Sequence, residues 1–188
     1  MKSAKIINFL DSSKNKITPF SINSVKINGF MGEYLEKMLK VTILSQYEML
    51  EKVGTIDNFL IASGKKKGSF KGMVFSDSDV YKWLEASSYA LLFSDDKELK
   101  EKVDKTIQEI KDAQDKDGYI NTYFTFERKK ERWSDLATKH ELYCAGHLIQ
   151  AAVAHKRVTE EDTLLDVAMK FADLIANTFG LDKKRGAP

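Results

Sequence analysis

The chain has 188 residues, of which 43% are hydrophobic and 31% charged, and its formal net charge at pH 7 is +2. This length supports one domain with a real core, and the interleaved charges exclude a strongly basic surface for nucleic acid or anionic membranes. The single cysteine, Cys144, excludes an internal disulfide. Because neither a secretory leader nor an apolar run of about 20 residues is recognisable, we expect a cytoplasmic protein with no membrane partner.

The first part of the chain changes character near residue 29. Residues 1–28 lack helical periodicity, and the stretch 17–27 alternates β-forming with polar residues around Pro19, which predicts an extended arm or short strands. From Phe30 onward, apolar residues recur every three or four positions as far as Gly54. This spacing predicts one long amphipathic helix of roughly 20 to 25 residues.

A long connection follows, over residues 54–78. It contains four glycines and no sustained period, with one short helical turn predicted at 57–62. Long connections inside a compact domain are often functional. Because Phe70 and Phe75 lie in it and solvated linkers are poor in aromatic residues, we expect the connection to pack against the rest of the domain.

Four further helices are predicted by periodicity, over residues 79–93, 95–114, 140–155 and 159–179. The helices at 79–93 and 140–155 are rich in small and aromatic residues. The helices at 95–114 and 159–179 each have one apolar stripe, and charged residues cover the rest of their surface. A β-prone stretch, residues 119–124, lies between the two pairs, and residues 127–139 read as a loop. The alternation predicts an all-α fold in which inner and outer helices form hairpins around a centre.

His140, Cys144 and His147 are spaced so that they share one face of the helix predicted at 140–155. Three interpretations stay open: the histidines hydrogen-bond a polar ligand, they satisfy core hydrogen bonds, or the three side chains bind a metal ion. The metal hypothesis is the weakest, because the segment has no His-Glu-x-x-His pattern and the sequence offers no further ligand spacing.

Carboxylates and aromatic residues supply further candidates. Asp77 and Asp79 could be a carboxylate pair of the kind that glycosidases use, but a role as helix N-caps explains them equally well. Glu141 is favoured at a helix start by the helix dipole alone. The large aromatic residues could stack on a sugar or form core: Trp83, Tyr119, Tyr123 and Trp133. Asn121, a polar residue among them, is the better candidate for a ligand contact.

Three segments resemble one known family. FSDSDVYKWLEASSYAL (75–91), DGYINTYF (117–124) and HELYCAGHLIQAAVAH (140–155) together resemble the N-terminal part of glycoside hydrolase family 127, which includes β-L-arabinofuranosidases. VKINGFMGEYLEKM (25–38) and QYEMLEKVGTIDNF (46–59) resemble the family's opening segments, in the same order. Five segments in register make the resemblance specific.

The resemblance implies an (α/α)6 barrel that hydrolyses L-arabinofuranosides, or related plant-type oligosaccharides, with retention of configuration. In this family a zinc-bound cysteine thiolate is the nucleophile and a glutamate is the acid/base; the zinc keeps the thiol deprotonated. Those residues are expected outside this chain, so we assign no catalytic or metal-binding residue here, Cys144 included, and expect zinc only in the complete enzyme. The substrate contacts that we predict are His140 first, then His147, with Asn121, Tyr123 and Asp79.

Length completes the prediction. An (α/α)6 barrel has six inner and six outer helices, which take roughly 350 residues at usual helix and loop lengths. We therefore expect residues 1–28 to form an extended arm and residues 29–188 the N-terminal half of a barrel, truncated at its C-terminus. Such a half is expected to be inactive alone and to associate with a complementing C-terminal half or with a copy of itself. The alternative is a non-catalytic helical module that binds carbohydrate or serves as a scaffold.

Overall fold

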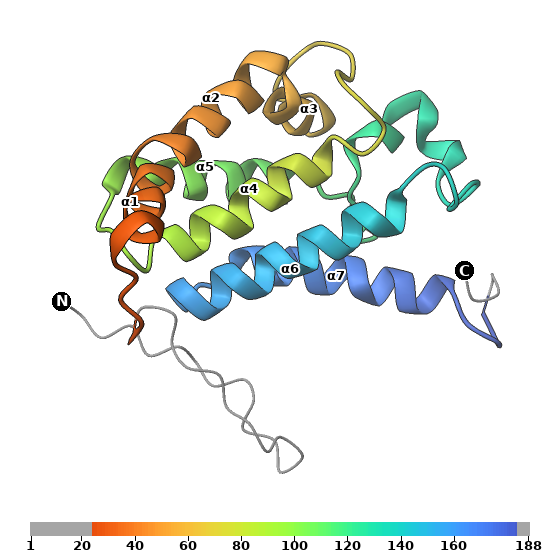
Figure 1. Ribbon diagram of the computed structural model, residues 1–188. Coiled ribbons are helices and arrows are strands. Elements are labelled where there is room, and N and C mark those ends of the chain that lie inside the picture. Colours follow the sequence, from red (N-terminus) through yellow and green to blue (C-terminus); the bar gives the residue numbers. More distant parts are fainter. Residues whose placement is uncertain (1–23, 184–188) are drawn as a thin grey trace.

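The computed structural model describes residues 24–183, and these residues form helices and loops with no β-strand (Figure 1). The all-α class is therefore confirmed. Most of the predicted extended arm lies outside the described residues, and residues 25–28 have no regular secondary structure. Within the described range, no helix has both the length and the apolar character needed to cross a membrane.

The predicted long helix is present, but it is interrupted. A π-helical turn, η2 (Met38–Thr42), joins α1 (Gly29–Lys37) to α2 (Ile43–Val53), and Gly54 ends the helix in the left-handed conformation with φ 82°. The apolar stripe of this helix is not buried along its whole length. Neither α1 nor η2 has a fully buried residue, and Phe30 is 78% exposed; α2 supplies the buried residues of this helix, and Leu39 of η2 packs against the core while only partly buried.

The remaining helices follow the predicted order. The turn expected at 57–62 is a complete short helix, and the bounds of the other elements differ from the predicted ones by a few residues: α3 (Thr55–Ala62), α4 (Asp77–Ala90), α5 (Lys97–Ala113), η3 (Thr122–Phe124), η4 (Phe126–Glu131), α6 (Glu141–Thr159) and α7 (Thr163–Thr178). Asp96 caps α5 by accepting a hydrogen bond from the Leu99 amide at 3.0 Å.

The β-prone stretch at 119–124 contains the short 3-10 helix η3 instead of a strand. The Asn121 side chain accepts a hydrogen bond from the Tyr123 amide at 3.1 Å, which stabilises a turn. The Thr122 amide is bound by Asp77, 45 positions earlier in the chain, and is therefore not available to a strand ladder. These bonds from side chains to the backbone outweigh the β propensity of the aromatic residues.

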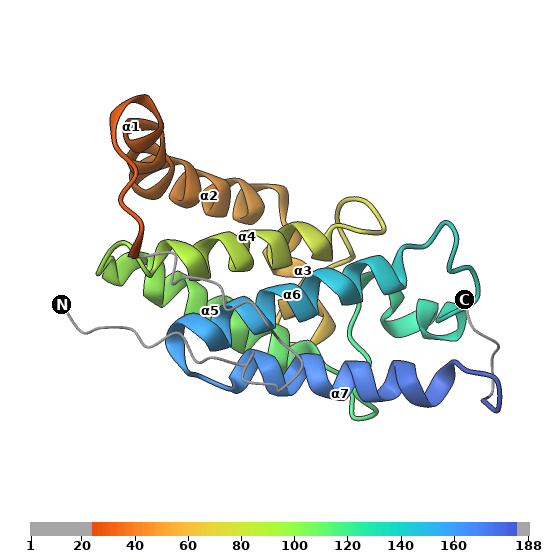
Figure 2. The ribbon, with the colours of Figure 1, turned by 60° about the horizontal axis from the view of Figure 1, so that its bottom comes forward.

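The helices form two layers. α4 and α6 lie side by side and begin at the same end of the molecule, whereas α5 and α7 pack behind them and run the other way (Figures 1 and 2). Both inner helices bury small side chains, including Ser87 and Ser88 of α4 and Ala151 and Ala152 of α6, and small side chains let helices approach closely. This is the predicted arrangement of inner and outer helices.

A buried carboxylate anchors the connection between α5 and α6. Glu141, the first residue of α6, is 0% exposed. It accepts a 2.5 Å hydrogen bond from the Tyr119 hydroxyl and bonds from the Trp133 amide at 2.9 and 3.0 Å. Burial and the neighbouring Glu141 carboxylate raise the pKa of Tyr119 above its ordinary value, so this hydroxyl remains a donor. Glu141 therefore does not only interact favourably with the dipole of α6; it also holds the connection through Tyr119 and Trp133.

Replacing Tyr119 with phenylalanine should lower the free energy of unfolding by about 1.5–3 kcal/mol, because a buried charged acceptor loses one of its donors. Urea denaturation measures this change. Tyr34→Phe is the matched control, because Tyr34 is 55% exposed. Equal stabilities of the two variants would show that the Tyr119–Glu141 bond contributes no net stability.

Candidate functional site

A row of rings follows the start of α6. The centroid of the His140 ring lies 5.2 Å from that of Phe75 and 5.7 Å from that of Tyr143, and the Tyr143 ring lies 4.7 Å from that of His147. The rings meet edge to face, an arrangement that aromatic pairs favour. We call His140, Tyr143 and His147 the histidine–tyrosine row; separations of three and four residues place them on one side of the helix.

The prediction that His140, Cys144 and His147 share one face of a helix is wrong in two respects. His140 precedes α6 as its N-cap residue, in the left-handed conformation with φ 55°. Cys144 points into the packed interior: it is 1% exposed, and its thiol donates to the Phe75 carbonyl at 3.8 Å. Burial, reinforced by the nearby Asp77, raises the pKa of the thiol to about 12, so Cys144 is protonated at neutral pH. Within residues 24–183, the three side chains form no metal-binding cluster.

Charged residues of α4 flank the row. Lys82 Nζ lies 5.2 Å from the centre of the Tyr143 ring and 3.5 Å from Asp79 Oδ1. The structure therefore brings three of the five predicted substrate contacts, His140, His147 and Asp79, to the same face of the two inner helices. This face is open in the described part of the chain, where the Asp79 side chain is 49% exposed and Tyr143 45%.

Asn121 and Tyr123, the other two predicted contacts, lie beside this face on and next to η3. The Tyr123 ring packs edge to face on Phe70 at 5.1 Å between centroids, with the Arg128 guanidinium 4.5 Å from its centre. The connection between α3 and α4 supplies both Phe70, against Tyr123, and Phe75, against His140. The expectation that this connection packs against the domain is thus correct, and it joins the two parts of the candidate site.

Two of the predicted substrate contacts have a buried polar atom with no hydrogen-bond partner within residues 24–183. These atoms are His147 Nδ1 and Asn121 Nδ2. Leaving a buried polar group unpaired costs about 1–3 kcal/mol, so folded proteins satisfy almost all such groups. Both atoms therefore have hydrogen-bonding capacity available for a polar ligand or for ordered water.

Asp77 fixes η3 onto the start of α4. Ser76 is the N-cap residue of α4, so the prediction of an Asp77 cap is wrong; the Asp77 side chain accepts hydrogen bonds from the Thr122 amide, at 2.7 Å, and from the Thr122 hydroxyl. Asp77 is 1% exposed. Burial raises the pKa of its carboxyl group to about 6 against the lowering effect of the two Thr122 bonds. Asp77 therefore locks the loop in place and, unlike Asp79, does not lie on the open face.

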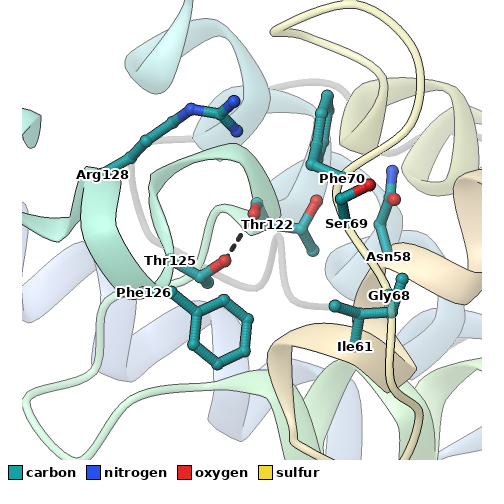
Figure 3. Close-up of a pocket in the computed structure, with 9 residues that line it drawn as sticks. All are labelled: Asn58, Ile61, Gly68, Ser69, Phe70, Thr122, Thr125, Phe126 and Arg128. Carbon is teal, nitrogen blue, oxygen red and sulfur yellow. Dashed lines mark hydrogen bonds between the residues drawn. The ribbon is translucent and has the colours of Figure 1, made fainter.

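A hollow of about 440 Å³ lies next to Tyr123, between η4 and the connection that leads into α4 (Figure 3). Hydroxyl groups, aromatic rings and one guanidinium line it, among them Ser69, Phe70, Thr122, Phe126 and Arg128. Asn58 holds its outer wall by donating to the Lys71 carbonyl at 2.8 Å and accepting from the Lys71 amide at 2.9 Å. The sequence analysis proposed none of these residues as a ligand contact. It named Phe70 only as a residue expected to pack against the domain.

Sequence reasoning also missed Tyr143 and Lys82. Tyr143 could have been found, because it follows His140 by three residues and precedes His147 by four, the spacing of neighbours on a helix. Lys82 carries no comparable signal, since its approach to Tyr143 depends on how α4 packs against α6. The spacing that grouped Cys144 with the two histidines was misleading, because spacing alone does not show which side of a helix faces the core.

Comparisons with known proteins identify the group to which the chain belongs. The sequence profile described as "Beta-L-arabinofuranosidase, GH127 catalytic domain" matches residues 24–186. A non-reducing end β-L-arabinofuranosidase of Bifidobacterium longum subsp. longum is 42% identical over 133 residues, which is 69% of this chain. These matches and the all-helical fold define a glycoside hydrolase domain of the α/α-barrel class. In particular, the chain belongs to glycoside hydrolase family 127, the family of β-L-arabinofuranosidase catalytic domains.

Solved structures agree with this assignment. A GH127 β-L-arabinofuranosidase from Geobacillus stearothermophilus T6 superposes on 86% of the chain with a TM-score of 0.81 and 42% identity. A second GH127 β-arabinofuranosidase superposes on 88% with a TM-score of 0.80 and 33% identity. The chain spans 27% and 28% of these two proteins and 20% of the Bifidobacterium enzyme.

Stability should depend on pH through Asp77. Because its folded pKa of about 6 exceeds the ordinary value of 3.8, the folded protein binds a proton between these values that the unfolded chain releases. The contribution of Asp77 to stability is therefore greatest below about pH 4 and is lost, by about 2–3 kcal/mol, as the pH rises to about 6.

Urea denaturation of the wild type and of Asp77→Asn at pH 4, 5.5 and 7 measures this contribution. The difference in unfolding free energy between the two proteins should shift in favour of the variant as the pH rises. Asp95→Asn, at an exposed loop position, is the matched control. Parallel pH curves for the wild type and Asp77→Asn would contradict the assignment of a raised pKa.

Proposed function

We propose that this chain forms the sugar-binding wall of a β-L-arabinofuranosidase that acts at the non-reducing end of L-arabinofuranosides. The observation that carries the proposal is the histidine–tyrosine row on the open face of two inner helices, in a chain that belongs to family 127. The name of the Bifidobacterium relative, a non-reducing end β-L-arabinofuranosidase, supports the choice of substrate.

The chemistry of the row suits a furanose ring. A neutral sugar presents hydroxyl groups that donate and accept hydrogen bonds, and C–H groups that pack against aromatic rings. The imidazoles of His140 and His147 and the Asp79 carboxylate match the hydroxyl groups, and Tyr143, a residue that is 45% exposed, offers its ring. The unpaired Nδ1 of His147 is a site where a hydroxyl group would satisfy a buried atom. We rank His140 first, because it lies at the helix start, where the loops meet the open face.

Asn121 and Tyr123 have supporting roles in this proposal. Both lie on or next to η3, and Lys139, the residue before His140, has its Nζ 5.4 Å from the centre of the Tyr123 ring. A substrate that extends beyond one sugar would reach Tyr123 and then the hollow lined by Phe126 and Arg128. The Asn121 amide lies deeper, since its residue is 2% exposed, and bonds either the substrate or a water molecule.

We place the reaction chemistry outside this chain. The zinc ion of the family calls for thiolate and other ligand atoms that converge, and here the buried, protonated Cys144 turns away from His140 and His147. These residues do not fit a zinc site. We therefore propose that the nucleophile, the acid/base glutamate and the zinc ligands belong to another part of the complete enzyme, and that this chain alone is inactive.

An exposed apolar surface indicates where that other part would dock. α1 and η2 have no fully buried residue, and four of their large apolar residues are more than half exposed: Phe30 78%, Met31 61%, Tyr34 55% and Val41 55%. Several exposed large apolar side chains on one short segment indicate an interaction site. We propose that the remainder of the barrel covers it; a second copy of the chain is the competing occupant. The cytoplasmic location likewise stays a prediction.

The test is hydrolysis of 4-nitrophenyl β-L-arabinofuranoside. The purified chain should release no nitrophenol, and addition of a polypeptide with the remaining part of the family's catalytic domain should restore activity. In that complex, His140→Ala should lower kcat/KM about 5- to 150-fold, the equivalent of about 1–3 kcal/mol for a lost hydrogen bond to the sugar. Met169→Ala, an exposed position on the outer helix α7, is the control.

Each part of the proposal can fail separately. Turnover by the chain alone with its metals chelated would show that the chemistry is wrongly placed. An unchanged kcat/KM in His140→Ala would show that His140 packs against its neighbours and does not contact the sugar. Sugar binding by the complex without any hydrolysis would favour the alternative, a non-catalytic carbohydrate-binding module.

A further inference from the structure

Three side chains with metal-binding atoms meet at the other end of α6 from His140. They are Asp104 of α5, His155 near the end of α6, and Glu161 in the turn between α6 and α7. One ligand atom from each lies within 4.8 Å of the others. His155 is 0% exposed, whereas Asp104 and Glu161 are open to solvent, with side chains 46% and 47% exposed. A buried imidazole thus forms the base of the cluster and two carboxylates its rim.

The hydrogen bonds of Thr159 select the tautomer of His155. The Thr159 hydroxyl donates its proton to the His155 carbonyl at 2.8 Å, so towards the ring it acts as an acceptor. His155 Nδ1 lies 3.4 Å from the same oxygen, so we assign the proton to Nδ1. In this tautomer the lone pair lies on Nε2. Fixing one imidazole nitrogen by such a bond is how proteins prepare the other nitrogen for a metal ion.

His155 Nε2 is a buried atom without a hydrogen-bond partner in the described part of the chain. Nδ1 has the Thr159 contact, so the ring is held with one satisfied and one open nitrogen. A buried imidazole in a core normally finds partners for its polar atoms, because an unpaired acceptor loses the hydrogen bonds that water gave it. A buried imidazole with an unpaired nitrogen, clustered with two carboxylates, is an acceptor arrangement that a cation satisfies.

An ammonium group partly occupies this position. Lys100 Nζ contacts the Asp104 carboxylate and lies 3.0 Å from Glu161 Oε1. One positive charge faces two negative ones, and the ammonium leaves Nε2 unpaired. A divalent ion would balance both carboxylates and bind the imidazole as well. Lys100 is 35% exposed at its side chain, so its head group can move into solvent when such an ion binds.

The cluster has an entry path. A hollow of about 730 Å³ lies beside it, and Glu161 lines this hollow together with Lys100 and Thr159. An ion can therefore arrive from solvent at the exposed carboxylates of Glu161 and Asp104 and exchange some of its bound water for the ligand atoms. Access of this kind is one of the requirements for a metal site.

We propose that Asp104, His155 and Glu161 bind a divalent transition-metal ion of the zinc class, in competition with the Lys100 ammonium. One imidazole and two carboxylates suit Zn²⁺, whereas Mg²⁺ prefers oxygen ligands alone. The ion would join α5, α6 and the turn before α7, so its role is to brace the outer layer. This site does not depend on the proposed sugar chemistry, and its test requires no enzymatic activity.

The probe is Zn²⁺ itself, titrated into the chelator-treated full chain by calorimetry, with a thermal melt as a second readout. We expect one Zn²⁺ per chain, a rise in melting temperature with Zn²⁺, and at least about tenfold weaker binding of Mg²⁺. Glu161→Gln changes an exposed residue, leaves the fold intact, and should weaken Zn²⁺ binding about tenfold or more; His155→Asn should abolish it.

Two further variants make the test specific. Lys100→Gln removes the competing ammonium and its exposed ion pairs, so it should strengthen Zn²⁺ binding about 2- to 20-fold. His147→Asn, the same exchange two turns earlier on α6, should leave binding unchanged. Absence of stoichiometric Zn²⁺ binding would overturn the proposal. So would binding that survives Glu161→Gln and His155→Asn, or that is lost in His147→Asn.

Discussion

The carboxylate of Glu141 is the point on which the candidate site depends. It sits at the first residue of α6, fully buried, and takes the Tyr119 hydroxyl and the Trp133 amide from a connection that has no regular sheet or long helix of its own. An ionisable group without water must be satisfied by protein donors, so the connection can adopt few other shapes. His140 immediately precedes Glu141, and its position follows from this constraint.

Asp77, at the start of the neighbouring inner helix, also holds a loop segment through hydrogen bonds to a buried carboxylate. It lies at the start of α4 and binds both the amide and the hydroxyl of Thr122, between Asn121 and Tyr123. The two inner helices thus each begin with a buried acid that holds a loop segment, and the loop segments carry the residues proposed to contact sugar. Asp79, two positions after Asp77, is the carboxylate that the helix turns towards solvent. Two neighbouring aspartates therefore have different roles because of the direction in which each points.

Periodicity predicted the helices well because the helical repeat is a local property of the sequence. It also predicted the division into inner and outer helices, since α5 and α7 need only one apolar stripe each. The η3 turn was missed because its decisive bond joins residues 45 positions apart. The same limit explains the site: His140 and His147 could be chosen from spacing, but the burial of Cys144 and the approach of Lys82 to Tyr143 depend on how α4 packs against α6.

The π-helical turn η2 gives the first long helix two different orientations. Each residue gained in such a turn rotates the following helix by about 100° relative to an uninterrupted α-helix. The apolar stripe that starts at Phe30 therefore does not continue into the one that buries Tyr47, although the two look continuous in the sequence. The two parts of one helix therefore differ in their surroundings: α2 packs into the core, and α1 leaves large apolar side chains such as Phe30 exposed within the described residues.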